Sequence, residues 1–416
     1  MAILIIKKYR PDIIGITGSI GKTNAKEAID AVLTNKFNVR KNLKNYNNEI
    51  GVPLSIIGCE SGNANLIKWL KVFWQALKLL ILIDKNYPQI LILEMGADKK
   101  GDIDYLVKFA RPKVSVVTAI APVHLEFFGN LNGIIEEKKK IATCLKKDDW
   151  LVINYDDEQV KNFINYSKAR NISFGFNQQA DLVALEPKIS QIENQWGINF
   201  KLSYKGNIIP IFLAEVLGQP QIYSVLAGAA VGVIYELNLL EISQAIKNYQ
   251  PAKSRLHLIK GIKNTLIIDD TYNSSPKACL TAVEILSEFP LNSPGQRWAV
   301  LGDMLELGNY TEVGHQLVGQ RIAELKNIDF LVTVGERAKD IKKGAREAGL
   351  SDDKIFSFNN VNEVGKFLQE EIREGDLILI KGSQGMRMEK IVKEIMAEPE
   401  KVKELLCRQD ESWENK

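Results

Sequence analysis

The chain has 416 residues, a length that accommodates two or three domains. Apolar residues make up 45% and charged residues 25%, which is typical of globular proteins and not of disordered or fibrous ones. The formal net charge is only +3, so we expect no nucleic-acid partner. The four cysteines include no C-x-x-C pair, which argues against a structural zinc site or a disulfide framework and favours a cytoplasmic protein.

Residues 1–155 alternate short β-rich runs with helical patterns. The runs are DIIGIT, QILILEMG, KVSVVTAI and WLVIN, and helix-compatible stretches separate them. This alternation predicts a parallel sheet wrapped by helices. The apolar run at the start of the chain is interrupted by Lys7 and Lys8, so it is too short for a signal peptide.

The strongest local signal is IIGITGSIGKT at residues 13–23, where a strand runs into a glycine turn and then a helix. Glycines let backbone N–H groups converge on phosphate oxygens, and the helix N-terminus adds a favourable dipole. Lys22 would reach the β and γ phosphates, while the Thr23 hydroxyl would bind Mg²⁺. Ile16 stands where the strict G-x-x-x-x-G-K-[ST] pattern has its first glycine. The order of strand, loop and helix still predicts a nucleoside triphosphate site.

Residues 66–83, LIKWLKVFWQALKLLILI, are apolar except for Lys68, Lys71, Gln75 and Lys78. On a helix these four side chains fall within roughly 80° of arc. A helix that crosses a bilayer would not carry three lysines along its length. We favour a helix packed into the protein with its lysines in water. The alternative is a helix that lies on an anionic membrane or on another protein.

Two further strand ends in the first half carry polar groups suited to metal and phosphate chemistry. Glu94 closes the run at 89–93, and His124 follows the run at 114–120. The carboxyl ends of parallel strands meet at one edge of a sheet, so both should lie beside the phosphate loop and bind Mg²⁺ there. Lys138 lies in EEKKK, which in isolation is typical of a solvated helix face.

The chain changes character after residue 172. The runs ISFGF, ADLVAL, WGINFKLSY and NIIPIFL lie close together with turn residues between them, which predicts antiparallel hairpins. A small-residue helix, SVLAGAAVGVIYEL, follows. The chain breaks near Tyr249–Pro251, and a second alternating series begins: TLIIDD, RWAVLGDM, FLVTVG and DLILIKGS.

We therefore predict an α/β protein of two domains. Residues 1–251 should form a P-loop central domain with a parallel sheet plus antiparallel hairpins. Residues 252–398 should form a smaller Rossmann-like α/β domain at the C-terminal side. Residues 399–416 should be a charged tail that frays.

Six motifs, in this order along the chain, resemble those of the Mur ligases. They are TGSIGKT (17–23), NNEIGVPL (47–54), EMGA (94–97), APVHLE (121–126), DDTYNSSP (269–276) and LGDMLELG (301–308). The resemblance runs from about Ile13 to about Lys393 and is greatest to the members that add D-alanyl-D-alanine. The DNPR-type motif of the sister that adds diaminopimelate is absent from the sequence. The Ala-His-Asn-Pro motif of folylpolyglutamate synthases is replaced here by residues 272–276.

The resemblance implies an ATP-dependent ligase of peptidoglycan synthesis. ATP would phosphorylate the carboxylate of a UDP-N-acetylmuramoyl tripeptide, and the amine of D-alanyl-D-alanine would then attack the acyl phosphate. The developing charge would be stabilised by Mg²⁺, Lys22 and backbone donors. Two alternatives remain: a folylpolyglutamate or poly-γ-glutamate type ligase with the same chemistry, and a non-catalytic ATP-binding subunit.

The resemblance also implies roles for individual residues of the first domain. The phosphates of ATP would be bound by Gly18, Ser19, Ile20, Gly21, Lys22 and Thr23. Two Mg²⁺ ions are expected, one on Thr23 and Glu94 and one placed by His124. A carbamylated lysine would bridge to the metal, and the matching residue is Lys138, with Lys139 as the competing register. Lys22, Glu94, His124 and Lys138 would be the catalytic set.

Further residues of the second domain are implied in the same way. Nucleotide contacts are expected from Arg255, Asp270, Asn273 and Asp303, and substrate contacts from Tyr272 and Lys381, together with Asn48 of the first domain.

The sequence departs from the family pattern in two places. The family's uridine-binding domain precedes the phosphate loop, and only 14 residues precede Gly15 here, so this domain is expected to be lacking. The helix at 66–83 is an insertion that would compensate by docking to a membrane or a protein partner. Where the family has a His-Asn pair and a later Asn that contacts adenine, this chain has Pro220, Gln221 and Ser224.

Overall fold

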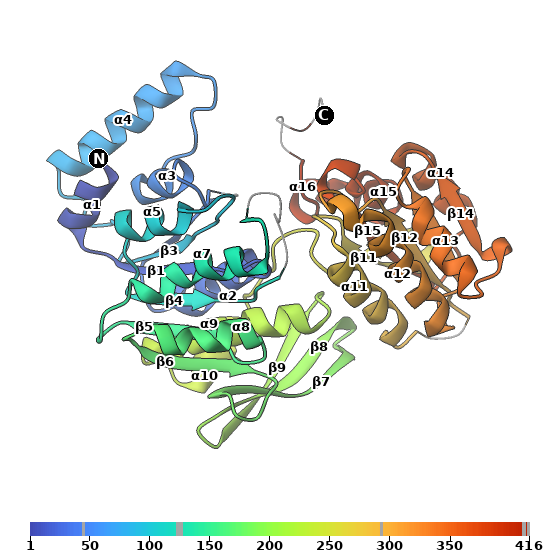
Figure 1. Cartoon of the computed structure of the whole chain (residues 1–416), viewed down its shortest axis with the longest axis horizontal. Helices are drawn as coiled ribbons and strands as arrows, with labels where there is room; N and C mark the ends of the chain where they lie inside the picture. Colours follow the sequence, from blue (N-terminus) through green and yellow to red (C-terminus); the bar gives the residue numbers. More distant parts are fainter. Residues whose placement is uncertain (44–45, 122–127, 292–293, 410–412, 414–416) are drawn as a thin grey trace. The chain divides into compact units, whose positions relative to one another are not determined.

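The computed structural model describes residues 1–43, 46–121, 128–291, 294–409 and 413, and these divide into two units (Figure 1). Unit 1 consists of Met1–Pro187, Phe200–Phe212 and Gln219–Gln250. Unit 2 consists of Lys188–Asn199, Leu213–Gly218 and Pro251–Lys416.

The first sheet has nine strands in the order β2-β3-β1-β4-β5-β6-β7-β8-β9. Strands β1 to β6 run parallel, and β7 joins β6 in parallel as well. From Ile13 onward every residue of β1 is buried, as expected of a parallel strand covered on both faces. The strands are β1 Asp12–Thr17, β2 Val39–Lys41, β3 Ile90–Glu94, β4 Val114–Val117, β5 Trp150–Asn154, β6 Arg170–Gly175, β7 Leu182–Ile192, β8 Gln195–Tyr204 and β9 Asn207–Ala214.

The hairpins that we predicted begin one strand later than expected. The run ISFGF lies in β6, which pairs in parallel with β5 and is not part of a hairpin. The turns at Glu193-Asn194 and Lys205-Gly206 have positive φ at both positions. Two-residue turns of this type join antiparallel strands, so β7, β8 and β9 form the hairpins.

Helices cover both faces of the first sheet. One face packs in a common core with α1 Ala2–Tyr9, α3 Gly51–Ile57, α4 Leu66–Ile81, α5 Asp102–Phe109, α7 Leu131–Thr143 and η1 Asn162–Tyr166. On the opposite face α2 Lys22–Thr34 packs against α9 Gln219–Ile234 and α10 Leu239–Ile246. A Cβ at Gly228 would lie 2.9 Å from the carbonyl oxygen of Ala28, so the small residues of α9 allow a close approach to α2. The short α8 Glu158–Lys161 follows β5.

The helix predicted at 66–83 forms over Leu66–Ile81, and it packs one face against the protein with its lysines exposed, in line with the interpretation that we favoured. Only Val72, Ala76 and Leu79 of α4 are buried, and most of its large apolar side chains are exposed along with its lysines. None of the helices in the described part of the chain is both long and apolar enough to cross a membrane.

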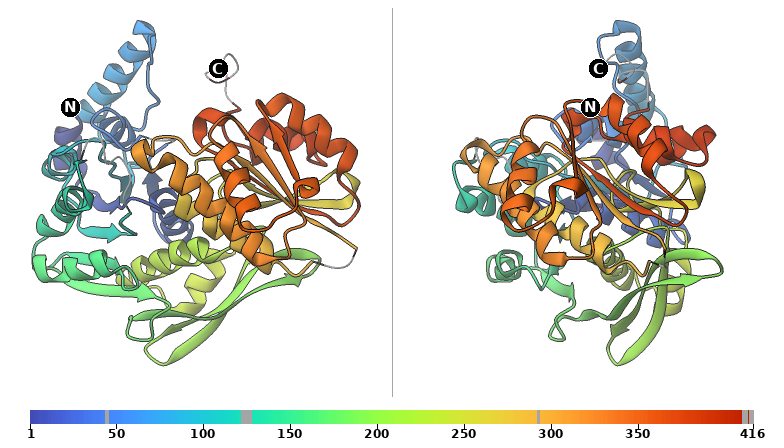
Figure 2. Two further views of the ribbon diagram at one scale, coloured as in Figure 1. Left: turned by 45° about the vertical axis from the view of Figure 1, so that its right-hand side comes forward. Right: turned by 90° about the vertical axis from the view of Figure 1, so that its right-hand side faces the viewer.

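The second sheet, in unit 2, has six strands in the order β10-β11-β15-β12-β13-β14. Figure 2 shows this part of the chain in yellow to red. Only β10 is antiparallel to its neighbour, and the other pairs are parallel. The strands are β10 His257–Gly261, β11 Thr265–Asp270, β12 Arg297–Gly302, β13 Phe330–Val334, β14 Ile355–Phe358 and β15 Leu377–Lys381. The helices are α11 Pro276–Glu288, α12 Thr311–Leu325, α13 Lys339–Glu347, α14 Val361–Glu371 and α15 Glu389–Ile395.

The C-terminal segment was expected to fray, and up to residue 409 that expectation is wrong. It forms η6 Pro399–Lys401 and α16 Val402–Leu405. Leu406 is 1% exposed and Cys407 is buried as well. The Cys407 N–H donates to the Ser254 hydroxyl at 3.2 Å, so the segment folds back on the start of the second α/β series.

Helices α12 and α13 pack without room for a side chain at Gly319. A Cβ there would lie 1.9 Å from the carbonyl oxygen of Ile341. We expect Gly319→Ala to lower the free energy of unfolding by about 1–3 kcal/mol, because the helices must separate to admit the methyl group. Urea unfolding of the whole chain measures this. A variant as stable as the wild type would contradict the close packing.

Candidate active site

The phosphate loop lies between β1 and α2 and is held by the residues that follow β4. The Ser19 N–H donates to the Ala119 carbonyl at 2.6 Å, and the Thr118 hydroxyl donates to the Ile20 carbonyl at 2.6 Å. Gly18 has a φ of +150°, and a Cβ there would lie 2.0 Å from the Thr118 hydroxyl oxygen. The loop therefore requires glycine at this position, since the strand next to β1 presses against it.

The N-terminus of α2 and the Lys22 ammonium both lie at the phosphate loop. Gly21 is the N-cap of α2 with a φ of +86°, and no side chain caps the helix. The first N–H groups of an uncapped helix are donors for an anion. The Lys22 ammonium donates to the carbonyl of Gly18 at 2.8 Å, which holds it over the loop. These groups are suited to binding phosphate.

Glu94, at the end of β3, lies directly beside the start of α2. The Thr23 hydroxyl donates to its Oε2 at 3.1 Å, and the Asn47 amide donates to its Oε1 at 3.2 Å. The Glu94 N–H donates in turn to Asn42 Oδ1 at 2.5 Å. Glu94 is only 4% exposed, so the carboxylate is fixed in position by both of its oxygens.

Sequence analysis singled out Asn48 and missed Asn47 and Asn42. Asn48 Oδ1 accepts from the N–H groups of Ile50 and Gly51 and so caps the start of α3. Its neighbour Asn47 is the residue that contacts Glu94. The motif NNEIGVPL marked the right segment. The sequence alone does not show which of the two adjacent asparagine side chains points toward Glu94, because that depends on the backbone turn between them.

The structure brings Lys138 to the buried side of α7. Lys138 is 4% exposed, whereas Lys139 pairs with Glu136 and lies over the ring of Tyr166. Burial lowers the pKa of Lys138 to about 7, and the positive charge of Lys22 also lowers it, while the Glu137 and Asp98 carboxylates act in the opposite direction. The buried amine of Lys138 therefore loses its proton more readily than an exposed lysine does.

Glu137, which sequence analysis placed on a solvated face, is also buried. Its carboxylate accepts from the N–H groups of Gly101 and Ile103 at 2.8 and 2.7 Å, at the start of α5. A carboxylate is stabilised at a helix N-terminus, and here it fixes the rotation of α7. That rotation turns Lys138 inward.

His124 lies outside the described residues, since the description stops at Ala121 and resumes at Phe128. Ala121 itself lies at the phosphate loop, because its carbonyl accepts from the Ser19 hydroxyl at 3.0 Å. The predicted role of His124 stays a prediction.

The residues at this site fit Mg²⁺ without forming a complete metal cage. Within the described ranges, no cluster of three or more His, Cys, Asp or Glu side chains has the arrangement of a metal site. The Thr23 hydroxyl and the Glu94 carboxylate are hard oxygen donors that lie together. Mg²⁺ prefers such donors and is usually held by one or two carboxylates, with phosphate and water completing its shell.

In unit 2, Lys381 and Asp270 form a buried ion pair. The Lys381 ammonium donates to Asp270 Oδ2 at 2.6 Å and to the Asn273 carbonyl at 3.0 Å, and Lys381 is 2% exposed. The side chain expected to bind substrate thus orients the loop after β11. Asn273 Oδ1 accepts from the N–H of Ser274 within the same loop.

Asp303 follows β12 and ties three strand ends of unit 2 together. Its Oδ1 accepts from the Ala338 N–H at 2.8 Å, and its carbonyl accepts from the Ser383 N–H at 3.0 Å. Burial raises the pKa of the Asp303 carboxyl above its usual range. These contacts are structural, and the nucleotide contact expected of Asp303 stays a prediction.

Arg255 and Tyr272 form a cation–π pair that the C-terminal segment supports. The Arg255 guanidinium lies 4.0 Å from the centre of the Tyr272 ring. Arg408 donates to the carbonyls of Thr271 and Tyr272 and to the buried carboxylate of Glu389. Nothing in the composition of the C-terminal segment pointed to this role for Arg408.

The positions that depart from the family pattern are engaged inside unit 1. Gln221 Oε1 accepts from the Tyr249 hydroxyl at 2.7 Å and from the Asn24 amide at 3.2 Å. The Ser224 hydroxyl donates to the Pro220 carbonyl at 3.0 Å. These side chains fasten α9 to the start of α2.

Comparison with known proteins places this fold and site in a family. The family model for the Mur ligase middle domain matches residues 74–232, and that for the Mur ligase, glutamate ligase domain matches residues 254–384. The chain is 31% identical over 387 residues to UDP-N-acetylmuramoyl-tripeptide–D-alanyl-D-alanine ligase of Bacillus subtilis, covering 93% of this chain and 76% of that protein. For the ligase of the same name from Escherichia coli, identity is 28%, with 92% of this chain and 76% of that protein covered.

Solved structures agree with the sequence matches. A crystal structure of MurF from Acinetobacter baumannii superposes with a TM-score of 0.76 at 26% identity, covering 94% of this chain and 78% of that chain. MurF ligase from Thermotoga maritima in complex with ADP gives a TM-score of 0.75 at 26% identity, covering 97% and 83%. The fold and the phosphate loop thus define a P-loop α/β protein. The chain belongs to the Mur ligase family.

Removal of Arg408 tests the buried cluster in unit 2. Glu389 is fully buried and is held by Arg387 and Arg408. We expect Arg408→Met to lower the free energy of unfolding by about 3–5 kcal/mol, because it leaves a buried carboxylate short of a partner. Arg408→Met combined with Glu389→Gln should recover most of the loss. An unchanged unfolding midpoint in the single variant would contradict this.

Proposed function

We propose that this protein is an ATP-dependent peptide ligase that adds D-alanyl-D-alanine to a UDP-N-acetylmuramoyl tripeptide in peptidoglycan synthesis. The observation that carries the proposal is the joining of the phosphate loop to Glu94 through Thr23, within a chain that belongs to the Mur ligase family. The relatives named for this reaction, from Bacillus subtilis and Escherichia coli, match over more than nine tenths of this chain.

The reaction requires activation of a carboxylate, which is a poor electrophile. A carboxylate oxygen of the tripeptide attacks the γ-phosphorus of ATP, and ADP leaves. The amine of D-alanyl-D-alanine then attacks the acyl carbon, loses a proton and expels inorganic phosphate. Lys22 and the N–H groups of α2 would neutralise the charge on the phosphates during the first step.

Mg²⁺ would be held by Thr23 and Glu94, where it would neutralise charge on the phosphate oxygens. Lys138 would add a further oxygen ligand if its amine were carbamylated. Only a neutral amine attacks CO₂, forming an N–C bond and releasing a proton. The pKa of about 7, caused first by burial, leaves the amine of Lys138 largely neutral at slightly alkaline pH.

From unit 2 we propose that Arg255, Asp270 and Asn273 contribute to ATP binding and that Tyr272 contributes to substrate binding. Their support is the cation–π pair of Arg255 with Tyr272 and the ion pair of Asp270 with Lys381, which hold this loop in one conformation. His124 and Asp303 keep the roles that the family resemblance implies for them.

Release of inorganic phosphate from ATP and Mg²⁺ tests the proposed function. We expect release only when UDP-N-acetylmuramoyl tripeptide and D-alanyl-D-alanine are both present. Release with glutamate and a folate or polyglutamate acceptor instead would move the substrate class to the folylpolyglutamate type. ATP binding without release under either condition would indicate a non-catalytic subunit.

Replacement of Lys22 tests the phosphate loop. We expect Lys22→Ala to lower ATP turnover by about 100-fold or more, because the ammonium that neutralises phosphate charge is lost. Lys36→Ala, on the exposed end of the same helix region, is the matched control and should retain turnover. A Lys22→Ala protein with wild-type turnover would remove this loop from the reaction.

Replacement of Lys138 tests the carbamate. Lys138→Ala should lose turnover, and a short-chain carboxylic acid should partly restore it by supplying the missing oxygen ligand. High bicarbonate should restore nothing, since no amine remains. Lys139→Ala is the control. Wild-type turnover in Lys138→Ala would exclude this side chain from the site.

The lowered pKa of Lys138 determines how the contribution of this residue to folding stability changes with pH. Between pH 7 and pH 10.5 the unfolded chain binds more protons at this residue, so its contribution to folding stability rises with pH through that window. Below pH 7 the folded protein must bury a charged ammonium. We therefore expect Lys138→Met to raise the free energy of unfolding at pH 6, measured in urea. A lower value would contradict the burial of an amine at this site.

A further inference from the structure

Helix α4 has three distinct faces. Val72, Ala76 and Leu79 are buried against the protein. The next face, spanning roughly 100° of arc, is apolar and exposed, and we call it the α4 outer face. It consists of Leu66, Ile67, Leu70, Trp74, Leu77 and Ile81. Beside it lies the α4 lysine edge, made of Lys68, Lys71, Gln75 and Lys78.

The outer face is exposed to an extent unusual for a folded protein. Leu66 is 74% exposed, Trp74 is 70% exposed and Ile81 is 69% exposed. Single exposed apolar side chains are ordinary, but a continuous apolar face indicates a surface that is covered in use. Neither α4 nor the loop after it is an unanchored segment. The Lys8 ammonium donates to the carbonyls of Leu79 and Leu82.

Helix α1 extends the same surface. Ile3 and Leu4 of α1 are about half exposed, and Lys7 and Lys8 follow them on the helix. The Tyr9 hydroxyl donates to the Leu79 carbonyl at 3.0 Å, so α1 and the last turn of α4 are joined by several bonds. The two helices lie side by side in unit 1 (Figure 1).

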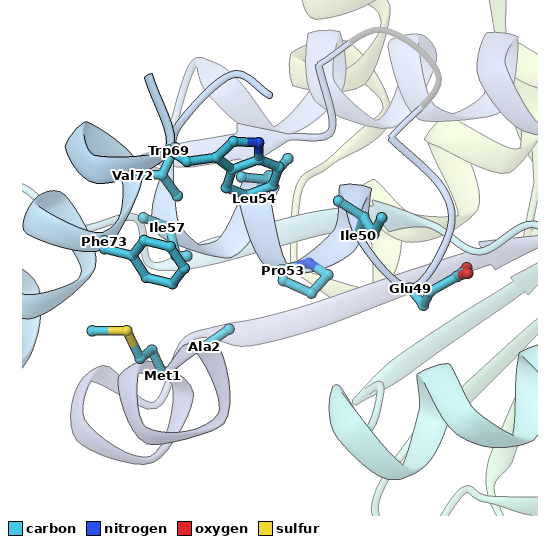
Figure 3. Close-up of a pocket in the computed structure, with 10 residues that line it drawn as sticks. All are labelled: Met1, Ala2, Glu49, Ile50, Pro53, Leu54, Ile57, Trp69, Val72 and Phe73. Carbon is cyan, nitrogen blue, oxygen red and sulfur yellow. The ribbon is translucent and has the colours of Figure 1, made fainter. Parts of the chain in front are cut away.

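Two hollows flank α4, and the side chains around them are largely apolar. A pocket of about 310 Å³ lies between α1, α3 and α4, and Figure 3 shows Met1, Pro53, Trp69 and Phe73 around it. A second hollow, of about 650 Å³, lies along the lysine edge and is lined by Ile67, Leu70, Lys71 and Trp74. Both hollows are large enough to accept apolar groups such as lipid acyl chains.

Along the sequence, the segment that forms α4 carries charge of one sign. No aspartate or glutamate occurs between Glu60 and Asp84, a stretch that contains Lys68, Lys71 and Lys78. The outer face is bordered directly by these three exposed lysines. An apolar helix face that contains Trp74 and is bordered on one side by three lysines is complementary to a bilayer with anionic headgroups.

We propose that the α4 outer face, with the exposed part of α1, docks on an anionic phospholipid membrane. The apolar side chains enter the boundary between headgroups and acyl chains, and the lysines reach lipid phosphates at its edge. The helix lies on the membrane, in agreement with the lack of a membrane-spanning helix among the described residues. This inference does not depend on the proposed ligase activity.

Docking would hold one end of the candidate active site near the membrane surface. The pocket beside α4 is also lined by Glu49 and Ile50. These residues follow Asn47, whose amide contacts Glu94.

Flotation of the full chain with vesicles tests the proposal. We expect binding to vesicles that contain phosphatidylglycerol and much weaker binding to phosphatidylcholine alone. Leu70→Glu with Trp74→Glu should abolish binding, and ATP turnover should be unchanged. Ile208→Glu with Leu240→Glu is the matched control, since both of these side chains are also exposed in unit 1.

The lysine edge is tested separately. Lys71→Ala with Lys78→Ala should lower partitioning to phosphatidylglycerol vesicles by about 30-fold, because each lysine near an anionic surface contributes about 1 kcal/mol. Lys188→Ala with Lys247→Ala, which removes the same charge elsewhere, should change partitioning little.

Three outcomes would overturn the proposal. The first is no binding to either vesicle, and the second is equal binding to both. The third is a concentration-dependent dimer, seen by sedimentation and abolished by Leu70→Glu with Trp74→Glu, in a protein that binds no vesicle. In that case a second copy of the chain covers the outer face. Because vesicle binding is measured without turnover, these outcomes are independent of the proposed reaction.

Discussion

The site depends on one constraint, the clamping of the phosphate loop between neighbouring strand ends. After β4, the Thr118 hydroxyl donates to the loop and the Ala119 carbonyl accepts from it. On the other side Glu94, at the end of β3, accepts from the Thr23 hydroxyl. These bonds on both sides fix the direction in which the start of α2 points. Because β1 is central between β3 and β4, the parallel order of the sheet alone makes this clamp.

Burial then sets the electrostatics of the site. The capping of α5 by Glu137 fixes the rotation of α7, and that rotation buries Lys138 near Lys22. Two ammonium groups in one region disfavour each other's charge, so the more buried one becomes the neutral amine. The burial of Lys138 and the nearby charge of Lys22 both lower the pKa of its amine, and this is the observation on which the proposed carbamate rests.

Much of the fold could be predicted from the sequence, because strands buried on both faces are continuous apolar runs. β1, β3, β4 and β5 were recognised in this way, as were β11, β12, β13 and β15. The short β2 and the edge strands β10 and β14 were missed, since little of their sequence differs from a loop. We predicted that β6 belongs to an antiparallel hairpin, but it pairs in parallel with β5. A short apolar run does not indicate the direction of the neighbouring strand.

The sequence predicted which segments form the site, but it did not predict which side chains contact one another there. The glycine loop, Glu94 and Lys138 were found from motifs, but Asn47, Asn42 and Glu137 act through tertiary contacts that no local pattern records. The same holds for Arg408, which reaches the loop at Tyr272 from the end of the chain. The exposure of most apolar side chains of α4 could not be predicted, because periodicity shows which side chains share a face and not which face is covered.

The central claim is that this site transfers phosphate from ATP to a carboxylate before the amide bond forms. The most direct measurement uses a tripeptide substrate whose reacting carboxylate carries ¹⁸O, followed by mass spectrometry of the released phosphate. The account predicts that one labelled oxygen appears in inorganic phosphate, because the amine expels the acyl phosphate with that oxygen attached. Phosphate without label, alongside amide product, would contradict it.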